Sequence, residues 1–195
     1  KLRSRPPICA GRAHAWRDGV AVALAPRMKR VVILGAGTGG TMMANRLSRI
    51  LSHDGWRITV VDRDDLHLYQ PGLLFLPFGD YRQDEIVKRR KNLLDPSVEL
   101  VLGEVDRVAP TENKVYVMSH APLAYDVLIV ATGSRILPEQ TTGLTGPGWK
   151  ETAFDFYTLE GALALRDALD RFEGGRFLVN VVEMPIKCPV APLEL

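Results

Sequence analysis

The chain has 195 residues, of which 46% are hydrophobic and 25% are charged, a composition typical of a globular protein with one or two domains. Its net charge of +2 combines +7 over residues 1–30 with −5 over residues 31–195, so a nucleic-acid-binding function would depend on the first 30 residues alone. We therefore expect no nucleic acid among its partners. No apolar run approaches the roughly 18 residues that a transmembrane helix needs, and none is predicted.

The first segment, residues 1–28, shows no sustained hydrophobic period. Its apolar stretch, Val20–Ala25, is short and lies late for the core of a signal peptide. We expect a disordered extension, with a targeting peptide as the alternative because the segment is rich in arginine and poor in acidic residues. Met28 would be a natural start for the ordered body.

A strand, a glycine-rich turn and a helix are predicted next. The apolar, β-branched run Val31–Leu34 is typical of a buried strand and leads into Gly35-Ala-Gly-Thr-Gly-Gly40. Apolar residues then recur at helical spacing, at Met42, Met43, Leu47, Ile50 and Leu51. A second strand, Ile58–Val61, ends at Asp62.

This order matches the G-x-G-x-x-G motif of dinucleotide-binding folds, with its strand before and its helix after. Gly35 would allow the tight turn, Gly37 would let the backbone approach a pyrophosphate, and Gly40 would let the helix pack close to the strand. The pyrophosphate would face the helix N-terminus. Asp62, 22 residues after Gly40, could accept hydrogen bonds from an adenosine ribose. A glycine-rich helix start that serves packing alone is the competing interpretation.

The rest of the first 140 residues favours FAD over NAD. An irregular stretch, residues 63–80, is followed by short predicted strands and then by a buried strand, Asp126–Val130, that ends in Ala131-Thr-Gly133; the short strands are Val98–Leu102, Glu104–Val108 and residues 113–118. This layout resembles the flavoproteins with two dinucleotide-binding domains, in which a Rossmann-like FAD domain carries a small β insertion and a returning strand that ends in A-T-G. An ordinary NAD dehydrogenase would have no reason to carry that strand.

The resemblance implies an α/β fold and a set of cofactor contacts. We expect a disordered extension over residues 1–28, an FAD-binding Rossmann-like domain over 29–140, and the incomplete start of a second, degenerate NAD-like domain over 141–195. The residues expected to contact FAD are Gly35, Gly37, Thr38, Gly39, Gly40, Asp62, Arg63, Gln70, Val105, Ala131, Thr132 and Gly133.

A second turn differs from the first. A helix is predicted over residues 158–172, followed by Gly174-Gly175 and by a strand, Arg176–Val182, that would lack sheet neighbours; the apolar face of the helix would carry Ala162, Leu165, Leu169 and Phe172. The turn after that strand, residues 183–190, has no glycine and contains two prolines. Because proline fixes φ and lacks an N–H, this turn cannot wrap the pyrophosphate of NADH.

The same turn carries Cys188. A thiolate there could attack sulfur and hold it as a persulfide, and the neighbouring Lys187 would favour the thiolate electrostatically. A buried structural cysteine is the alternative.

The segments "HLYQPGLLFLPFG", "YTLEGALALRDAL" and "EMPIKCPVAPLE" resemble the sulfide:quinone oxidoreductase family. The resemblance implies FAD, Cys188 as one redox cysteine, and transfer of electrons from sulfide to a membrane quinone. It also implies a partner cysteine beyond Leu195, so we expect an inactive N-terminal fragment, with peripheral membrane contact through the missing C-terminal part. Many family members have a further cysteine near the position of Tyr157, which this chain lacks; that departure narrows the subtype.

Three other functions stay open: a type II NADH:quinone oxidoreductase, another sulfur-handling flavoprotein, and a non-catalytic nucleotide-binding module. The sequence does not indicate an oligomeric state. No metal site is expected, because the cysteine and histidine residues are scattered singly, at Cys9, Cys188, His14, His53, His67 and His120.

Overall fold

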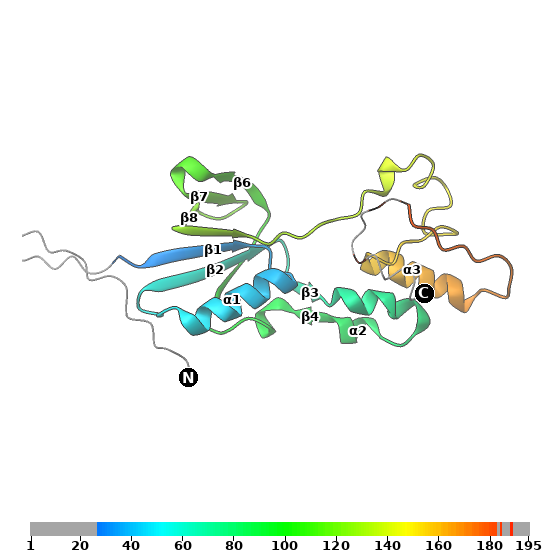
Figure 1. Cartoon of the computed structure of the whole chain (residues 1–195), viewed down its shortest axis with the longest axis horizontal. Helices are drawn as coiled ribbons and strands as arrows, with labels where there is room; N and C mark the ends of the chain where they lie inside the picture. Colours follow the sequence, from blue (N-terminus) through cyan, green and yellow to red (C-terminus); the bar gives the residue numbers. More distant parts are fainter. Residues whose placement is uncertain (1–26, 183, 185–187, 189–195) are drawn as a thin grey trace, which may run out of the picture.

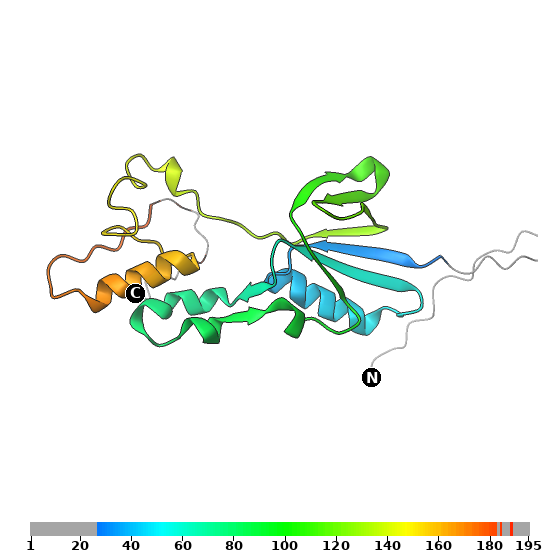
Figure 2. The same ribbon diagram turned by 180° about the vertical axis from the view of Figure 1, so that it is seen from behind.

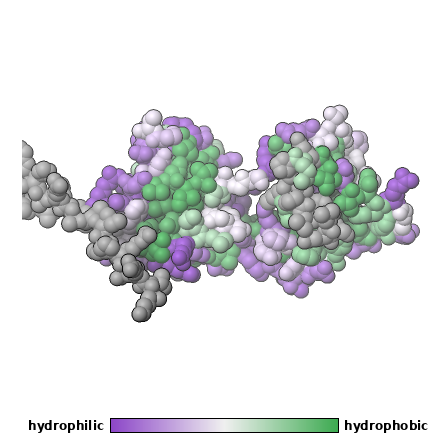
Figure 3. All heavy atoms as spheres, viewed as in Figure 1, coloured by the Kyte–Doolittle hydropathy of each residue, from purple (hydrophilic) through white to green (hydrophobic). Residues whose placement is uncertain are grey.

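The computed structural model describes residues 27–182 together with Met184 and Cys188. The predicted disordered extension and most of the turn at 183–190, Lys187 included, lie outside the described residues. The described chain forms two lobes joined by a narrow waist (Figures 1 and 3). One lobe contains the main sheet and the other contains the last helix.

A parallel four-stranded sheet forms the first lobe, with the strand order β5-β2-β1-β9. Its strands are β1 (Lys29–Leu34), β2 (Trp56–Asp62), β5 (Glu99–Leu102) and β9 (Val127–Val130). The helix α1 (Thr38–Ile50) connects β1 to β2. These four strands have the order 3-2-1-4 of the Rossmann fold, counted along the chain. The parallel sheet confirms the predicted α/β class.

The two faces of the sheet are covered differently because side chains alternate along each strand. Val31 and Ile33 of β1 face α1 and pack in one core cluster, which includes Ala44. Val32 and Leu34 face the opposite side, where they share a second cluster with the inserted strands. Strand β1 is therefore buried on both faces.

The predicted β insertion is present as a three-stranded antiparallel sheet (Figure 2). It consists of β6 (Val105–Ala109), β7 (Lys114–Val117) and β8 (Leu123–Ala124). Val115 and Val117 of β7 are buried against the main sheet. The insertion thus supplies the cover that a helix gives on the other face.

The segment between β2 and β5 leaves the first lobe and returns. It forms the ribbon of β3 (Leu66–Leu68) and β4 (Val87–Arg89), and the short helices η1 (Gln70–Leu74), η2 (Leu76–Phe78), α2 (Gln83–Ile86) and η3 (Arg90–Asn92). Leu73, Leu76 and Ile86 of this excursion pack against Ala162 of α3 (Leu159–Asp170). The core of the second lobe is therefore shared by segments about 80 residues apart. The remaining short helices are η4 (Pro110–Glu112) and η5 (Pro138–Gln140).

Two predictions about local structure are corrected. Residues 176–182 form no strand, because no other strand of the described chain lies beside them to complete a hydrogen-bonded ladder, and their apolar side chains are exposed. Of the apolar residues predicted to lie on the helices, several are exposed. Met42, Met43 and Ile50 are exposed in α1, whose buried face consists of the small residues Gly40, Thr41, Ala44 and Ser48. Phe172 lies beyond the end of α3 and is exposed.

Candidate cofactor-binding site

The glycine-rich turn is shaped by two close approaches of backbone to backbone. Gly35 has φ of +95°, and a Cβ there would collide with the carbonyl of Ala131. A Cβ on Gly40 would collide with the carbonyl oxygen of Gly35, so only glycine lets α1 start this close to the end of β1. The turn and the A-T-G end of β9 therefore meet, as the Ala131 N–H also donates to the Leu34 carbonyl at 2.7 Å.

A groove of about 2110 Å³ passes this turn and continues along the second lobe. Its volume exceeds the roughly 300–1,000 Å³ of a pocket for a drug-sized molecule. All the residues predicted to contact the cofactor line it except Gly40, which is buried under the turn; they are Gly35, Gly37, Thr38, Gly39, Asp62, Arg63, Gln70, Val105, Ala131, Thr132 and Gly133. The structure thus brings together residues from five separate segments.

Room for a phosphate exists at the start of α1. Gly37 is the N-cap, and no atom within 4 Å would contact a Cβ placed on it. The first N–H groups of a helix have no acceptors within that helix, and the helix dipole makes this end positive. No acidic residue occupies the first turn of α1. These features fit the pyrophosphate of a dinucleotide.

Asp62 contacts the turn itself, which the sequence does not reveal. Its Oδ2 accepts the Ala36 N–H at 2.7 Å and lies 3.2 Å from Nη1 of Arg90. Its Oδ1 accepts the Arg63 N–H at 2.8 Å. The carboxylate predicted to bind a ribose therefore also joins the end of β2 to the glycine-rich turn. Since one N–H is the only partner of Oδ1 among the described residues, that oxygen retains acceptor capacity toward the groove.

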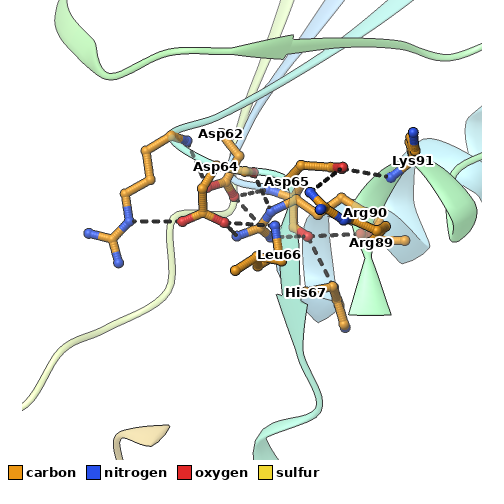
Figure 4. A network of polar contacts seen from close by, with 11 residues as sticks. Asp62, Asp64, Asp65, Leu66, His67, Arg89, Arg90 and Lys91 are labelled. Atoms are coloured by element: carbon orange, nitrogen blue, oxygen red, sulfur yellow. Dashed lines mark hydrogen bonds and ion pairs between the residues drawn. The ribbon is translucent and has the colours of Figure 1, made fainter. Parts of the chain in front are cut away.

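Three side chains around the Ala36 carbonyl were not identified from the sequence; two of them, His67 and Arg90, are labelled in Figure 4. This oxygen accepts from Nη1 of Arg90 at 2.6 Å and from Oγ1 of Thr41 at 3.0 Å, and it lies 3.2 Å from Nδ1 of His67. Arg90 belongs to the basic run 88–91, a pattern that ordinarily indicates a solvated surface. Nothing in that pattern distinguishes the buried arginine from its neighbours.

The far part of the groove lies at the N-terminus of α3. Thr158 caps this helix, accepting the Gly161 N–H at 3.0 Å, and the buried Asp155 accepts the N–H groups of Tyr157 and Thr158. The Tyr157 hydroxyl is buried without a hydrogen-bond partner in the described chain. Burial raises the pKa of this hydroxyl above its ordinary value, and the negative charge of a Cys188 thiolate raises it further.

Cys188 itself is exposed, is a free thiol, and has a φ of 55°. It does not line the groove, whereas Tyr157 does. Within the described chain Cys188 is therefore not buried, as a buried structural cysteine would be. Its redox role stays a prediction.

The described ranges contain neither a metal-binding cluster nor a membrane-spanning helix. Within residues 27–182 and the two later described positions, no group of His, Cys, Asp and Glu side chains could hold a metal ion. No helix in the same part of the chain is long and apolar enough to cross a membrane.

Residues 29–181 match the model of the family described as pyridine nucleotide-disulphide oxidoreductase. Over 165 residues the chain is 26% identical to the mitochondrial sulfide:quinone oxidoreductase of Mus musculus, an alignment that covers 85% of this chain and 36% of that protein. It is 27% identical over 184 residues to the alternative NAD(P)H-ubiquinone oxidoreductase C1 of Arabidopsis thaliana, covering 86% and 33%.

Among solved structures, the sulfide:quinone oxidoreductase of Aquifex aeolicus matches with a TM-score of 0.60 and 23% identity, over 73% of this chain and 32% of that one. At this identity the match shows a shared fold. The chain spans about a third of the length of the relatives that it matches.

Proposed function

Because this chain belongs to the pyridine nucleotide-disulphide oxidoreductase family, we propose that it is the FAD-binding part of an enzyme that oxidises sulfide and passes the electrons to a quinone. The similarity to a mitochondrial sulfide:quinone oxidoreductase supports the reaction, and both of the relatives compared are named as quinone or ubiquinone oxidoreductases. Under this proposal the domain boundary lies near residue 140, and the protein contacts a membrane peripherally to reach its quinone.

The flavin would occupy the groove with its ADP half at the glycine-rich turn. The N–H groups of Gly37, Thr38 and Gly39 would donate to the pyrophosphate, and Oδ1 of Asp62 would accept from the ribose. The Ala131–Gly133 turn would lie near the ADP half, because it follows the strand beside β1 and meets the glycine-rich turn. Bound there, FAD would accept two electrons from the sulfur substrate and deliver them to the quinone.

Cys188 would bind the sulfur covalently. Sulfide would attack a sulfur–sulfur bond between Cys188 and a partner cysteine. The cysteine that is attacked would carry the new sulfur as a persulfide, and the other cysteine would leave as a thiolate. In the overall reaction sulfide loses two electrons and becomes sulfane sulfur, while the quinone gains two electrons and two protons. The partner sulfur is not among the described residues.

The exposure of the free Cys188 thiol is the observation that supports this role most directly. Burial, and then the charge of a Cys188 thiolate, raise the pKa of Tyr157, which lines the groove proposed for the flavin. An exposed thiol is available to a small substrate such as sulfide.

A second candidate is NAD(P)H:quinone oxidoreduction, which the similarity to the Arabidopsis protein favours. The glycine-free segment 183–190 argues against it, because a pyrophosphate is bound by closely approaching backbone N–H groups and Pro185 and Pro189 have none. The rates at which sulfide and NADH reduce the flavin would therefore distinguish the two candidate functions.

The test replaces Cys188 by serine, which preserves size and removes the soft nucleophile. The intact protein should be yellow, and sulfide should bleach its flavin under anaerobic conditions while NADH bleaches it far more slowly. The Cys188→Ser variant should bind flavin normally and remain yellow with sulfide. We expect its rate of reduction by sulfide to fall at least about a hundredfold, the size of effect seen when a nucleophile is removed.

Cys9→Ser is the matched control, because it removes the other thiol of the chain and should leave reduction by sulfide unchanged. Reduction of Cys188→Ser at the rate of the unmodified protein would limit Cys188 to a structural role. Faster reduction by NADH than by sulfide would favour the second candidate.

A further inference from the structure

Arg90 places a buried cation directly under the glycine-rich turn. Its side chain is only 10% exposed and pairs with two carboxylates, those of Asp62 at 3.2 Å and Asp64 at 3.3 Å. The guanidinium also reaches two main-chain oxygens: Nε donates to the Asp64 carbonyl at 2.8 Å, and Nη1 donates to the Ala36 carbonyl at 2.6 Å. Figure 4 shows Arg90, from η3, beside Asp62 and Asp64 at and just after the end of β2.

The contact with Ala36 determines where the next N–H points. A trans peptide group is planar, so the carbonyl of Ala36 and the N–H of Gly37 point in opposite directions. Arg90 and Thr41 hold the carbonyl by donating to it, and Asp62 holds the other side of Ala36 by accepting its N–H. The Gly37 N–H therefore points away from Arg90, and Gly37 lines the groove.

The positive charge of Arg90 also affects Asp62. Asp62 lies beside the place where a pyrophosphate would bind, and two anions close together repel. Arg90 compensates the charge of Asp62 within the protein, so the carboxylate can serve the ribose without opposing the phosphates. A lysine would preserve the charge, but its single nitrogen could not contact Ala36, Asp62 and Asp64 together as the planar guanidinium does.

We propose that Arg90 is a positioning residue for the cofactor: it fixes the Ala36 peptide so that the Gly37 N–H faces the pyrophosphate, and it neutralises Asp62. The inference rests on the dinucleotide-binding part of the proposed function and is independent of the sulfur chemistry. It predicts that Arg90 supports the binding of phosphate groups more than the binding of the nucleoside.

The test measures binding of ADP and of adenosine by calorimetry, on the protein freed of flavin. Arg90→Gln should weaken ADP binding about a hundredfold, the effect of losing a buried charged hydrogen bond, and adenosine binding less than about threefold. Arg90→Lys should weaken ADP binding by about tenfold, because lysine preserves the positive charge but lacks the several N–H donors of the planar guanidinium. Arg89→Gln is the matched control, since the neighbouring Arg89 is 61% exposed and only approaches Asp65 at 3.4 Å; both affinities should stay within about twofold.

Thr41→Val carries the test if Arg90→Gln does not fold, because it removes one donor to the Ala36 carbonyl and preserves the shape of the side chain. It should weaken ADP binding by about threefold to tenfold and leave adenosine binding unchanged. Equal losses for ADP and adenosine in these variants, or no loss, would overturn the positioning role. If the unmodified protein bound neither FAD nor ADP, that result would instead contradict the proposed function.

Discussion

Strand β1 and residues 176–182 have similar sequences and different structures. Both are apolar, β-branched runs next to glycines, and both are predicted to be strands. In β1, Val31–Leu34 are at most 3% exposed, because β2 and β9 pair with the backbone and the two faces are covered by α1 and by the inserted sheet. In 176–182, Leu178 is 81% exposed, and no backbone hydrogen bond in the described chain involves the segment.

An apolar run therefore specifies burial only where other segments provide hydrogen-bond partners and cover. A strand stabilises itself through its ladder and through cross-strand packing, neither of which is local. The sequence pattern therefore predicts the tendency of a run, and the neighbours decide its structure. Three measurements test this comparison: amide hydrogen exchange, the stability of alanine variants in the two segments, and the stability of glycine variants at the start of α1.

The largest difference is expected in amide hydrogen exchange. The amides of Val32–Leu34 should exchange only through global unfolding, whereas those of residues 177–182 should exchange almost freely. For a global stability of about 5 kcal/mol, the ratio of protection factors exceeds roughly a thousandfold. Exchange followed by mass spectrometry would measure both segments in one sample. Comparable protection in the two segments would show that 176–182 is paired in solution.

A matched pair of substitutions, one in the core and one at an exposed position, should reproduce the difference in free energy. Ile33→Ala removes a fully buried side chain and should lower the free energy of unfolding by about 2–5 kcal/mol. Leu178→Ala removes a similar volume from an exposed position and should change it by less than about 0.5 kcal/mol. Chemical denaturation of both variants measures the effects. A cost above 2 kcal/mol for Leu178→Ala would mean that the segment is buried.

The same reasoning explains which parts of the fold and site could be predicted. The strands of the main sheet, α1 and the inserted strands followed from local patterns, because runs of apolar residues and the glycine motif carry that information. The packing of Leu73 and Leu76 on α3 could not be predicted, since it depends on a contact between distant segments. Residues 176–182 are predicted as a strand without sheet neighbours, and the local pattern does not show that the strand itself would be absent from the described chain.

In the candidate site, glycines and the acid at the end of β2 could be identified by their spacing. Arg90 could not, because it lies in a run of four basic residues of which it alone is buried. Its role depends on a main-chain oxygen, that of Ala36, and sequence patterns carry no information about such an acceptor. Polar residues that bind the backbone of a turn are therefore the least predictable part of this site.

The smallest effect concerns the helix that covers β1. Gly40→Ala should lower the free energy of unfolding by about 1–3 kcal/mol, because the new Cβ would collide with the Gly35 carbonyl and force α1 away from the strand. Gly39→Ala is the matched control: its Cβ would meet nothing within 4 Å, and its lower backbone entropy in the unfolded chain should raise the free energy of unfolding by about 0.5–1 kcal/mol. Denaturation of the two variants without added flavin separates packing from cofactor binding. Opposite signs would show that the cover of β1 depends on this close approach, whereas equal small changes would mean that α1 can move without exposing the strand.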